Sequence, residues 1–374
     1  MNILVFSWRD PKHSNAGGAE QVMHEHMKGW IEAGHSVTFF ASRIRGNPVR
    51  EEVIDGVKII RRGIQYFGVQ IAAFFYYLAN ADRFDLVVDQ FHGLPFFTPF
   101  YVFKPKLAVI QEVAGKVWLK NDLSKPLNLI VGIIGYLGEP FLFLFYRNVP
   151  FMTGSKSAME SLIKVGINPE NITVIPHGTK ITKPKPFPAK EKVKTVMFLG
   201  SISMDKGIDQ ALEAFGKINK AGKFKFWVVG RMSGNYTDYL NEKIKELGLT
   251  TNLKVFGFVS EEKKFELLAR AHVMVNPSVL EGWGLVNIEA NAMGTPVVAY
   301  NSPGLTDSVK NGLNGIICDK NTPDSMAKNV VELLGNREKY RKLAKGAVGW
   351  AGKFTWNRSK KLSLQLIKKV SSIN

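Results

Sequence analysis

Residues 276–300 read NPSVLEGWGLVNIEANAMGTPVVAY, and this stretch decides the fold. A short apolar strand ends where this stretch begins. A glycine-flanked acidic loop at 281–284 then leads into an amphipathic run at 285–293. The Gly-Thr-Pro sequence at 294–296 stops this helix because proline cannot continue it, and 297–299 starts another buried strand. The order strand, loop, helix and strand predicts a parallel βαβ step.

Two carboxylates frame this loop: Glu281 lies before the helix, and Glu289 lies within it, eight residues later. A helix advances about 1.5 Å per residue, so the pair spans roughly 12 Å. This separation is too long for two groups that share one proton, and it favours two separate acceptors of hydroxyl hydrogen bonds. In open α/β sheets, a loop between a strand's carboxyl end and a helix N-terminus is where anionic ligands bind. The alternative is a solvated loop glutamate and an ordinary helix glutamate.

A wider set of residues carries a resemblance to a known family. The pattern PS-x2-EGWGL-x2-IEA-x-A-x-GTPVVAY, followed by PGL at 303–305 and NG-x-NG at 311–315, resembles the nucleotide-sugar motif of the retaining GT-B glycosyltransferases of family 4, the glycosyl transferases group 1. The resemblance implies that Glu281 contacts the donor sugar at the catalytic centre and that Glu289 contacts the nucleotide ribose. It also implies that Gly284 and Leu285, at the start of the helix, belong to the donor-binding residues.

The resemblance also implies the domain organisation, an α/β protein with the GT-B fold in which two Rossmann-like domains face each other across a cleft. The first, acceptor-side domain covers residues 1–182. The proline-alternating segment within 183–190 predicts a linker, because it resists both helix and sheet. Residues 191–350 form the nucleotide-sugar domain, and the family carries a C-terminal helix, here within 351–374, that crosses back to the first domain.

The composition limits the class of protein. The 374 residues carry 50 basic and 32 acidic side chains, a net charge of +18, and are long enough for two or three domains. A single cysteine, Cys318, argues against a disulfide framework and fits a reducing compartment. The N-terminal residues read as a first core strand rather than a signal peptide, so we expect a cytoplasmic protein. The charge would also suit a nucleic-acid binder, but the lysines are spread through helices without a recognisable nucleic-acid motif, so we expect no nucleic-acid partner.

The first loop of the chain contains a glycine pair. WRDP at 8–11 and NAGGAE at 15–20 lie between the first strand and a helix. Gly17 and Gly18 allow backbone N–H groups to approach a phosphate or sugar closely. A glycine pair alone is more typical of a tight turn, but together with WRDP it resembles the family's N-terminal donor and acceptor loop. We therefore expect Gly17 and Gly18 to contact the donor.

Three residues of the first domain are candidates for contacts with the acceptor or the sugar. His92 lies just past the strand expected at 84–88, and Gln111 and Glu112 follow the strand expected at 106–110. Many family members carry a histidine at about the position of Gln111, where it meets the donor sugar. Glutamine keeps the hydrogen bonding and loses the titratable ring, which leaves Glu112 and Lys116 as neighbours that could compensate. A lone histidine such as His92 is more often a packing or capping residue.

The loop at 200–207, GSISMDKG, follows the first strand of the second domain and opens onto a helix. The leaving group of a nucleotide-sugar donor is a diphosphate, and Lys206 beside a helix N-terminus would stabilise its growing charge without a metal ion. The family usually has an arginine where this chain has Ser201. A neutral serine cannot replace a forked cation. Arg231, just after another strand, is the candidate substitute, and the alternative is a solvated loop arginine.

The segment 127–146, LNLIVGIIGYLGEPFLFLFY, is the most apolar part of the chain. Its length would nearly span a bilayer, but its glycines and an internal Glu-Pro pair predict two shorter helices, partly core and partly facing a membrane. With the aromatic runs at 74–77 and 96–97 and the net charge, it predicts a first domain that docks on an anionic membrane surface. The alternative is a soluble enzyme in which these segments are all core.

The resemblance as a whole predicts a retaining hexosyltransferase that moves a sugar from a nucleotide-diphosphate-sugar donor to a glycan or lipid-linked acceptor, as in polysaccharide or glycolipid biosynthesis. We recognise no metal-ligand cluster and no enzymic nucleophile, so we expect a metal-independent reaction without a cofactor, in which the leaving phosphate accepts the acceptor's proton. We expect the protein to work as a peripheral protein on the inner face of the membrane. The alternative is a non-catalytic GT-B protein that binds nucleotide sugar or partners an active transferase, and Gln111 and Ser201 keep it open.

Overall fold

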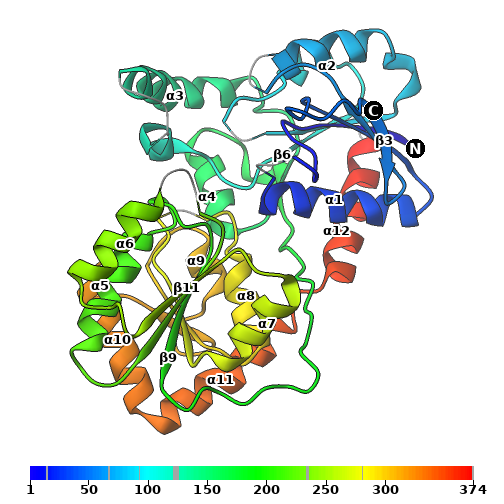
Figure 1. Cartoon of the computed structure of the whole chain (residues 1–374). Helices are drawn as coiled ribbons and strands as arrows, with labels where there is room; N and C mark the ends of the chain where they lie inside the picture. The colour runs from blue at the N-terminus through cyan, green and yellow to red at the C-terminus, as the bar shows by residue number, and fades with distance from the viewer. Residues whose placement is uncertain are drawn as a thin grey trace. The chain divides into compact units, whose positions relative to one another are not determined.

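The computed structural model describes residues 1–13, 16–65, 68–91, 93–120, 126–232, 236–279 and 281–372. The chain forms two compact units, Met1–Gly178 with Trp356–Asn374 and Thr179–Thr355. Each unit is built on one β-sheet flanked by helices (Figure 1), which confirms the predicted α/β class with two Rossmann-like domains. The division points at 178 and 355 differ by four and five residues from the predicted domain ends at 182 and 350.

The sheet of the first unit has the strand order β3-β4-β2-β1-β5-β6-β7-β8. Every neighbouring pair is parallel except β3 and β4, so the loops that follow the parallel strands gather at one edge. The hairpin strand β3 is missing from the sequence analysis, and β5 lies two residues later than the expected 84–88. The strands are β1 Asn2–Phe6, β2 Ser36–Ala41, β3 Glu51–Ile54, β4 Val57–Arg61, β5 Leu86–Gln90, β6 Lys106–Val109, β7 Phe151–Thr153 and β8 Ile172–Val174.

Helices cover both faces of this sheet, because its strands carry apolar side chains on each face. On one face α1 and α12 pack together, with Trp30 Nε1 donating to Ser363 Oγ at 3.1 Å (Figure 1). On the other face α2 packs through Val69, Ala73 and Tyr77. The helices are α1 Gly18–Glu32, α2 Gly68–Leu78, α3 Leu127–Leu144, α4 Lys156–Lys164 and α12 Trp356–Ser371, with the 3-10 turns η1 Ala81–Arg83, η2 Thr98–Phe100, η3 Gly115–Lys120 and η4 Pro169–Asn171.

The prediction of two shorter helices in the apolar segment is wrong. The structure has one continuous helix, α3, with Pro140 inside it. Proline removes one backbone hydrogen bond and crowds the preceding turn, which bends a helix more often than it ends one when the flanking residues favour helix. Only Gly132, Glu139 and Phe143 are buried, so α3 contacts the rest of the unit along a narrow stripe.

The sheet of the second unit is entirely parallel, with the order β11-β10-β9-β12-β13-β14. Numbered within the unit, this is the order 3-2-1-4-5-6 of the dinucleotide-binding Rossmann fold, and the strand order reverses between β9 and β12. The βαβ step predicted from the sequence is confirmed as β12, α8 and β13. The strands are β9 Thr195–Leu199, β10 Lys225–Val229, β11 Leu253–Gly257, β12 Val273–Asn276, β13 Val297–Ala299 and β14 Gly315–Ile317.

The helices of the second unit alternate with its strands and bury a shared apolar core. Ser260, Thr322 and Asn336 accept hydrogen bonds from the first turns of α7, α10 and α11, as N-cap side chains do. The helices are α5 Ile208–Asn219, α6 Tyr236–Glu246, α7 Glu261–Arg270, α8 Leu285–Ala292, α9 Leu305–Ser308, α10 Pro323–Gly335 and α11 Arg337–Ala351. The parallel strands therefore direct the loops 200–207 and 277–284 to the same edge of the sheet.

Candidate active site

Two loops meet where the strand order of the second sheet reverses. The loop 200–207 follows β9, and the loop 277–284 follows β12. The Val279 N–H donates to the Asp205 carbonyl at 3.2 Å, and Ser278 Oγ donates to the same oxygen at 3.4 Å. Gly207 has a φ of 74°, and a Cβ there would lie 2.3 Å from the Pro277 carbonyl oxygen. Only glycine permits this approach, which fixes the two loops against each other.

The two predicted catalytic residues form an ion pair across these loops. Lys206 Nζ lies 3.0 Å from Glu281 Oε1, and the two side chains are 29% and 20% exposed. The Glu281 N–H donates to the Pro303 carbonyl at 3.2 Å, and a Cβ on Gly304, whose φ is 75°, would lie 1.9 Å from the Glu281 carbonyl oxygen. The loop after β13 thus holds Glu281 in place. Both charged groups are reachable from solvent and stand next to the N-terminus of α5.

The start of α8 is held by buried amides that the sequence analysis missed. Asn276 Nδ2 donates to Asn287 Oδ1 at 2.8 Å, and Asn287 Nδ2 donates to Ser308 Oγ at 2.9 Å. Gly284 is the N-cap of α8, and Leu285 begins the helix as a half-buried side chain packed near Trp283. An asparagine inside an otherwise apolar helix start is the signal that could have identified Asn287, because buried amides need partners.

Glu289 lies on α8 with one carboxylate oxygen paired and the other unpaired. Lys264 Nζ, on α7, donates to Oε1 at 2.8 Å. The other oxygen, Oε2, is buried and has no hydrogen-bond partner among the residues that the structure describes. Burial raises the pKa of Glu289, and the Lys264 ammonium opposes that rise. An unpaired buried carboxylate oxygen is costly, so this arrangement can accept a hydrogen bond from a ligand hydroxyl.

Ser201 and Arg231 lie on adjacent loops. The Ile202 N–H donates to the Arg231 carbonyl at 2.9 Å, which joins the loop after β9 to the loop after β10. The Arg231 guanidinium carbon stands 5.0 Å from the centre of the Phe258 ring, a cation–π contact. Both residues are exposed. The structure therefore brings the backbone of Arg231 next to the position where the family arginine is missing, and its role as a substitute stays a prediction.

The predicted glycine pair lies at the start of α1 in the first unit. Gly17 is the N-cap and Gly18 the first helical residue. The Gly17 N–H donates to Glu20 Oε2 at 2.7 Å, and Glu20 Oε1 accepts from Arg9 Nε at 3.0 Å. The buried Glu20 therefore already occupies the N–H group of Gly17 that a phosphate would use. The donor contacts of Gly17 and Gly18 stay predictions.

Gln111 is a buried residue that follows β6. His177 Nε2 donates to Gln111 Oε1 at 2.6 Å, and burial lowers the pKa of His177 to about 3, so this ring stays neutral. His177 orients Gln111 and was not predicted as its partner, although its place in the turn after β8 was an available signal. Glu112 is half-buried beside Gln111, and His92 lies outside the described residues. Their contacts with a sugar or an acceptor stay predictions.

The comparison with known families concerns the second unit. Residues 179–350 match the family model described as glycosyl transferases group 1. This range contains the ion pair between Lys206 and Glu281, the paired Glu289, and the loops that carry them.

Single proteins are similar over longer stretches. An uncharacterised glycosyltransferase of Methanocaldococcus jannaschii is 31% identical over 240 residues, which cover 60% of this chain and 60% of that protein, so the chain spans less than two thirds of the relative's length. Sucrose-phosphate synthase from Thermosynechococcus elongatus has a similar structure, with a TM-score of 0.81, 18% identity and full coverage of both chains. HepE of Anabaena, solved with UDP-glucose, has a TM-score of 0.72 and 16% identity, over 99% of this chain and 100% of that one. The structural matches show that the chain has the GT-B fold.

Proposed function

We propose that the protein is a retaining glycosyltransferase that uses a nucleotide-diphosphate sugar, because residues 179–350 match the family model described as glycosyl transferases group 1. The observation that carries the proposal is the ion pair of Lys206 and Glu281 at the point where the strand order reverses. In open α/β sheets this is where nucleotide ligands bind. HepE, whose fold is similar, is a structure with UDP-glucose bound, which supports the class of donor.

Each of the three charged residues has a role in the proposed reaction. Lys206, beside the N-terminus of α5, stabilises the negative charge that grows on the leaving diphosphate. Glu281 accepts hydrogen bonds from the donor sugar's hydroxyls and positions the anomeric carbon. Glu289 accepts a hydrogen bond from a ribose hydroxyl through its unpaired Oε2. The lysine and the helix supply the positive charge, so the proposed reaction is metal-independent and uses no cofactor.

The bond changes follow from retention of configuration. The bond between the anomeric carbon and the phosphate oxygen breaks, and the electron pair stays on the diphosphate. The acceptor hydroxyl attacks the same face of the sugar ring, and its proton passes to the phosphate oxygen that has just been released. This scheme requires no enzymic nucleophile. Its rate depends on charge stabilisation by Lys206, which preorganised sites supply more effectively than water does.

Transfer from a labelled donor tests the proposal. Thermal shift first selects the nucleotide sugar that stabilises the chain, and transfer to a lipid extract or an oligosaccharide panel is then measured with it. Lys206→Ala and Glu281→Gln should lower kcat by about 100-fold or more, as removing one transition-state donor does. Lys217→Ala, which removes an α5 lysine paired with Asp324, is the charge-matched control and should keep full activity. Equal activity in all four proteins would refute the assigned roles.

The proposed acceptor is lipid-linked, and the proposed location is the inner face of a membrane, to which the protein binds peripherally. Exposed apolar side chains on α2, η2 and α3 support this. The three elements are connected, because the Phe74 ring packs on Tyr101 at 5.0 Å and the Phe100 ring packs on Phe145 at 4.7 Å. The exposed side chains on these elements are Ile71, Phe75, Leu78, Phe100, Leu127, Leu129, Ile130, Ile133, Ile134, Leu137, Phe141 and Leu144, and Phe103 and Phe145 lie just after η2 and α3.

By length and composition alone, α3 could cross a membrane, with a mean hydropathy of 1.7 and 17% of its residues buried. Both carboxylate oxygens of Glu139, on α3, accept hydrogen bonds from backbone N–H groups of the same unit, from Ala114 at 2.9 Å and from Gly115 at 2.6 Å. These bonds hold α3 against its own unit, so they favour a helix that lies on the membrane surface over one that crosses the membrane. Liposome sedimentation tests the proposal: binding should require anionic lipid and fall as salt rises. Equal recovery in the supernatant with neutral and anionic liposomes at low salt would refute it.

A non-catalytic protein that binds nucleotide sugar is the second candidate, and two observations favour it. Ser201 is exposed and neutral where the family has an arginine, and Gln111 bonds to His177 instead of offering an imidazole. Such a protein would bind the selected donor as tightly as an enzyme does. It would give neither transfer nor slow hydrolysis of that donor, even with an acceptor extract present, and this outcome would replace the enzymatic proposal.

A further inference from the structure

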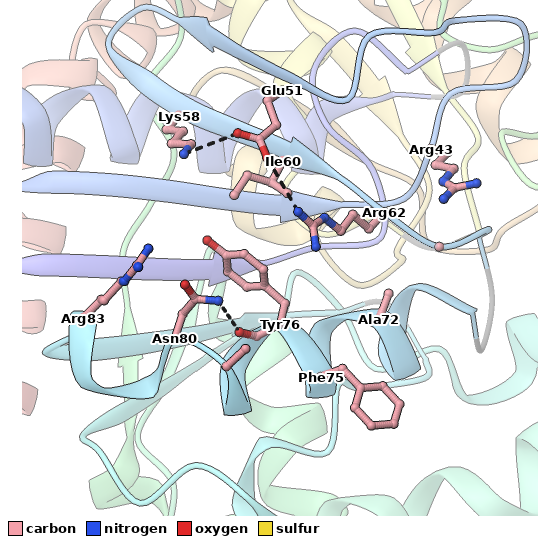
Figure 2. A pocket seen from close by; sticks show the side chains of 12 residues that line it. Arg43, Glu51, Lys58, Ile60, Arg62, Ala72, Phe75, Tyr76, Asn80 and Arg83 are labelled. Carbon is pink, nitrogen blue, oxygen red and sulfur yellow. Dashed lines mark hydrogen bonds and ion pairs between the residues drawn. The ribbon is translucent and has the colours of Figure 1, made fainter.

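A basic pocket in the first unit includes none of the residues predicted for the donor or acceptor. It lies between β4 and α2 and has a volume of about 490 Å³ (Figure 2). Lys58 and Ile60 of β4 and Arg62, just after the strand, stand at every second position and so share one face. Figure 2 shows Tyr76 extending from α2 towards these strand residues. The pocket is therefore a groove between a strand and the helix that covers it.

The charges that line this pocket are unbalanced. Four cations face one carboxylate, Glu51, which lies 3.4 Å from Lys58 and 3.7 Å from Arg62. Arg43 and Arg83 make no ion pair with a carboxylate of the described ranges. The Arg43 N–H donates to the Gly63 carbonyl at 2.9 Å, which ties the loop after β2 to the end of β4. Figure 2 shows Arg43 and Arg83 at opposite ends of the pocket, so an anion bound there meets one of these guanidinium groups together with the neighbouring cations.

The helix side of the pocket is apolar. Ala72, Phe75 and Tyr76 line it at positions i, i+3 and i+4 of α2 and share one face of the helix, and Ala79, the residue after the helix, lines it too. The Arg62 guanidinium stands 5.7 Å from the centre of the Tyr76 ring. A free inorganic anion gains nothing from such a wall. An anion that carries an apolar chain buries that chain against the wall and gains free energy from it.

A second stripe of α2 continues this apolar wall to the outside. Ile71, Phe75 and Leu78 follow one another at i, i+4 and i+7 and are 59%, 64% and 54% exposed. The opposite face, with Val69, Ala73 and Tyr77, is buried in the unit. A helix that is apolar on all sides is normally buried on all sides in a soluble protein. Phe75 belongs to both the pocket and the exposed stripe, so the two surfaces are continuous.

We infer that this pocket binds the phosphate group of an acidic lipid whose acyl chains leave across Phe75 and Ile71. Arginine forks match phosphate oxygens in pairs, and three of the four cations are arginines. The exposed stripe enters the acyl region of the bilayer, as the apolar face of an interfacial helix does. The inference deepens the proposed membrane function and rests on it, but it is independent of the donor site.

The test compares two charge-matched variants of the full chain without any donor. Arg43→Ala/Arg83→Ala removes the two unneutralised cations of the pocket. Arg45→Ala/Arg50→Ala removes two exposed arginines of the first unit that do not line it. Binding is measured by sedimentation with phosphatidylcholine vesicles that contain phosphatidic acid. The pocket pair should weaken binding by about 100-fold, the loss of one charge-assisted hydrogen bond from whichever arginine meets the phosphate. The control pair should change it by about fivefold or less, because its cations act only through a screened field.

Two further measurements separate a site from a charged surface. Ala79→Trp fills the pocket without changing the charge and should reduce binding to these vesicles, whereas tryptophan on an ordinary membrane-facing surface would increase it. Thermal melting verifies that each variant is folded. In calorimetry, short-chain phosphatidic acid below its micelle concentration should bind at least about tenfold tighter than inorganic phosphate, because only the lipid uses the apolar wall.

Three results would overturn the inference: equal losses in the two arginine pairs, undiminished binding by Ala79→Trp, or inorganic phosphate binding as tightly as the lipid. None of these measurements involves a nucleotide sugar. A chain that binds phosphatidic acid but lacks transferase activity would therefore contradict the proposed function alone, and an active transferase that fails these tests would contradict the lipid pocket alone.

Discussion

Glu289→Gln removes a charge at the carboxylate that has one buried, unpaired oxygen. Lys264 holds the other oxygen at 2.8 Å, so the side chain is fixed and Oε2 is available to a ligand. If Oε2 accepts a hydrogen bond from the ribose, that bond involves a charged acceptor and contributes about 1.5–3 kcal/mol. The variant should therefore bind the nucleoside diphosphate about 10- to 150-fold more weakly.

The same substitution should have little effect on folding. Lys264 also pairs with Glu261 at 2.9 Å, so it keeps a carboxylate partner when Glu289 becomes neutral. Burial raises the pKa of Glu289 and the Lys264 ammonium opposes that rise, so the substitution removes a desolvation cost together with the ion pair. The two effects oppose each other, and we expect the free energy of unfolding to stay within about 1 kcal/mol of the original. A loss of affinity in a chain of unchanged stability would identify a ligand contact.

Calorimetry with matched nucleotides locates the contact. The original chain should prefer the ribonucleoside diphosphate over the 2′-deoxy or 3′-deoxy analogue that lacks the contacted hydroxyl. Glu289→Gln should show a smaller preference, because the amide oxygen is a neutral and weaker acceptor. Glu261→Gln, which changes the other partner of Lys264, should leave the preference intact. If Glu289→Gln still discriminates between the hydroxyls as strongly as the original chain does, Glu289 does not contact the ribose.

Three further predictions follow from charged groups elsewhere in the chain. In calorimetry, Arg231→Ala should weaken the binding of a nucleoside diphosphate far more than the binding of a nucleoside, and adding Ser201→Arg should restore part of the lost affinity. Equal losses of affinity for both ligands would mean that Arg231 is only a surface residue. Burial lowers the pKa of His26 from 6.5 to about 4, so the unfolded chain takes up a proton that the folded chain excludes. Stability should therefore fall as the pH drops from about 6.5 to about 4, by about 2 kcal/mol at pH 5, and His26→Gln should reduce this fall in urea unfolding. The buried Arg61 donates to the buried Asp10 from Nε at 2.6 Å and from Nη2 at 3.0 Å. Arg61→Ala should therefore lower the free energy of unfolding by about 3–5 kcal/mol in the same assay. A loss below about 1 kcal/mol would contradict a stabilising role of the buried pair.

The local part of the candidate site could be predicted from the sequence because its signals are local. The loop before α8 and the loop before α5 each follow an apolar strand directly and combine glycines with charged residues, Glu281 in the first and Asp205 and Lys206 in the second. Parallel strands direct such loops to one edge, and the reversal of strand order between β9 and β12 brings them together. The contact between Lys206 and Glu281 follows from this topology, although 75 positions separate them along the chain.

The partners of the other residues could not be predicted, because they depend on how helices and loops pack. Lys264 reaches Glu289 from a different helix, and His177 reaches Gln111 across 66 positions. The single helix α3 was missed for a related reason. Glycine and proline lower the helix propensity of a segment. In α3, however, Gly135 makes room for the indole of Trp118, which packs against the helix where a Cβ would lie only 2.3 Å away. Tertiary packing of this kind outweighs intrinsic propensity.

The pair of Lys206 and Glu281 also indicates how the free protein keeps its site ready for a donor. Both side chains are half-buried charges on loops, and Glu281, at 3.0 Å, lies closer to Lys206 than Asp205 does at 3.9 Å. A partly exposed ion pair contributes only about 0–1 kcal/mol, so separating it costs little. A diphosphate offers Lys206 more negative charge than one carboxylate does, while the donor sugar offers Glu281 hydroxyl groups in place of the ammonium. The same contact can therefore hold both residues in position before binding and be exchanged for two ligand contacts when the donor arrives.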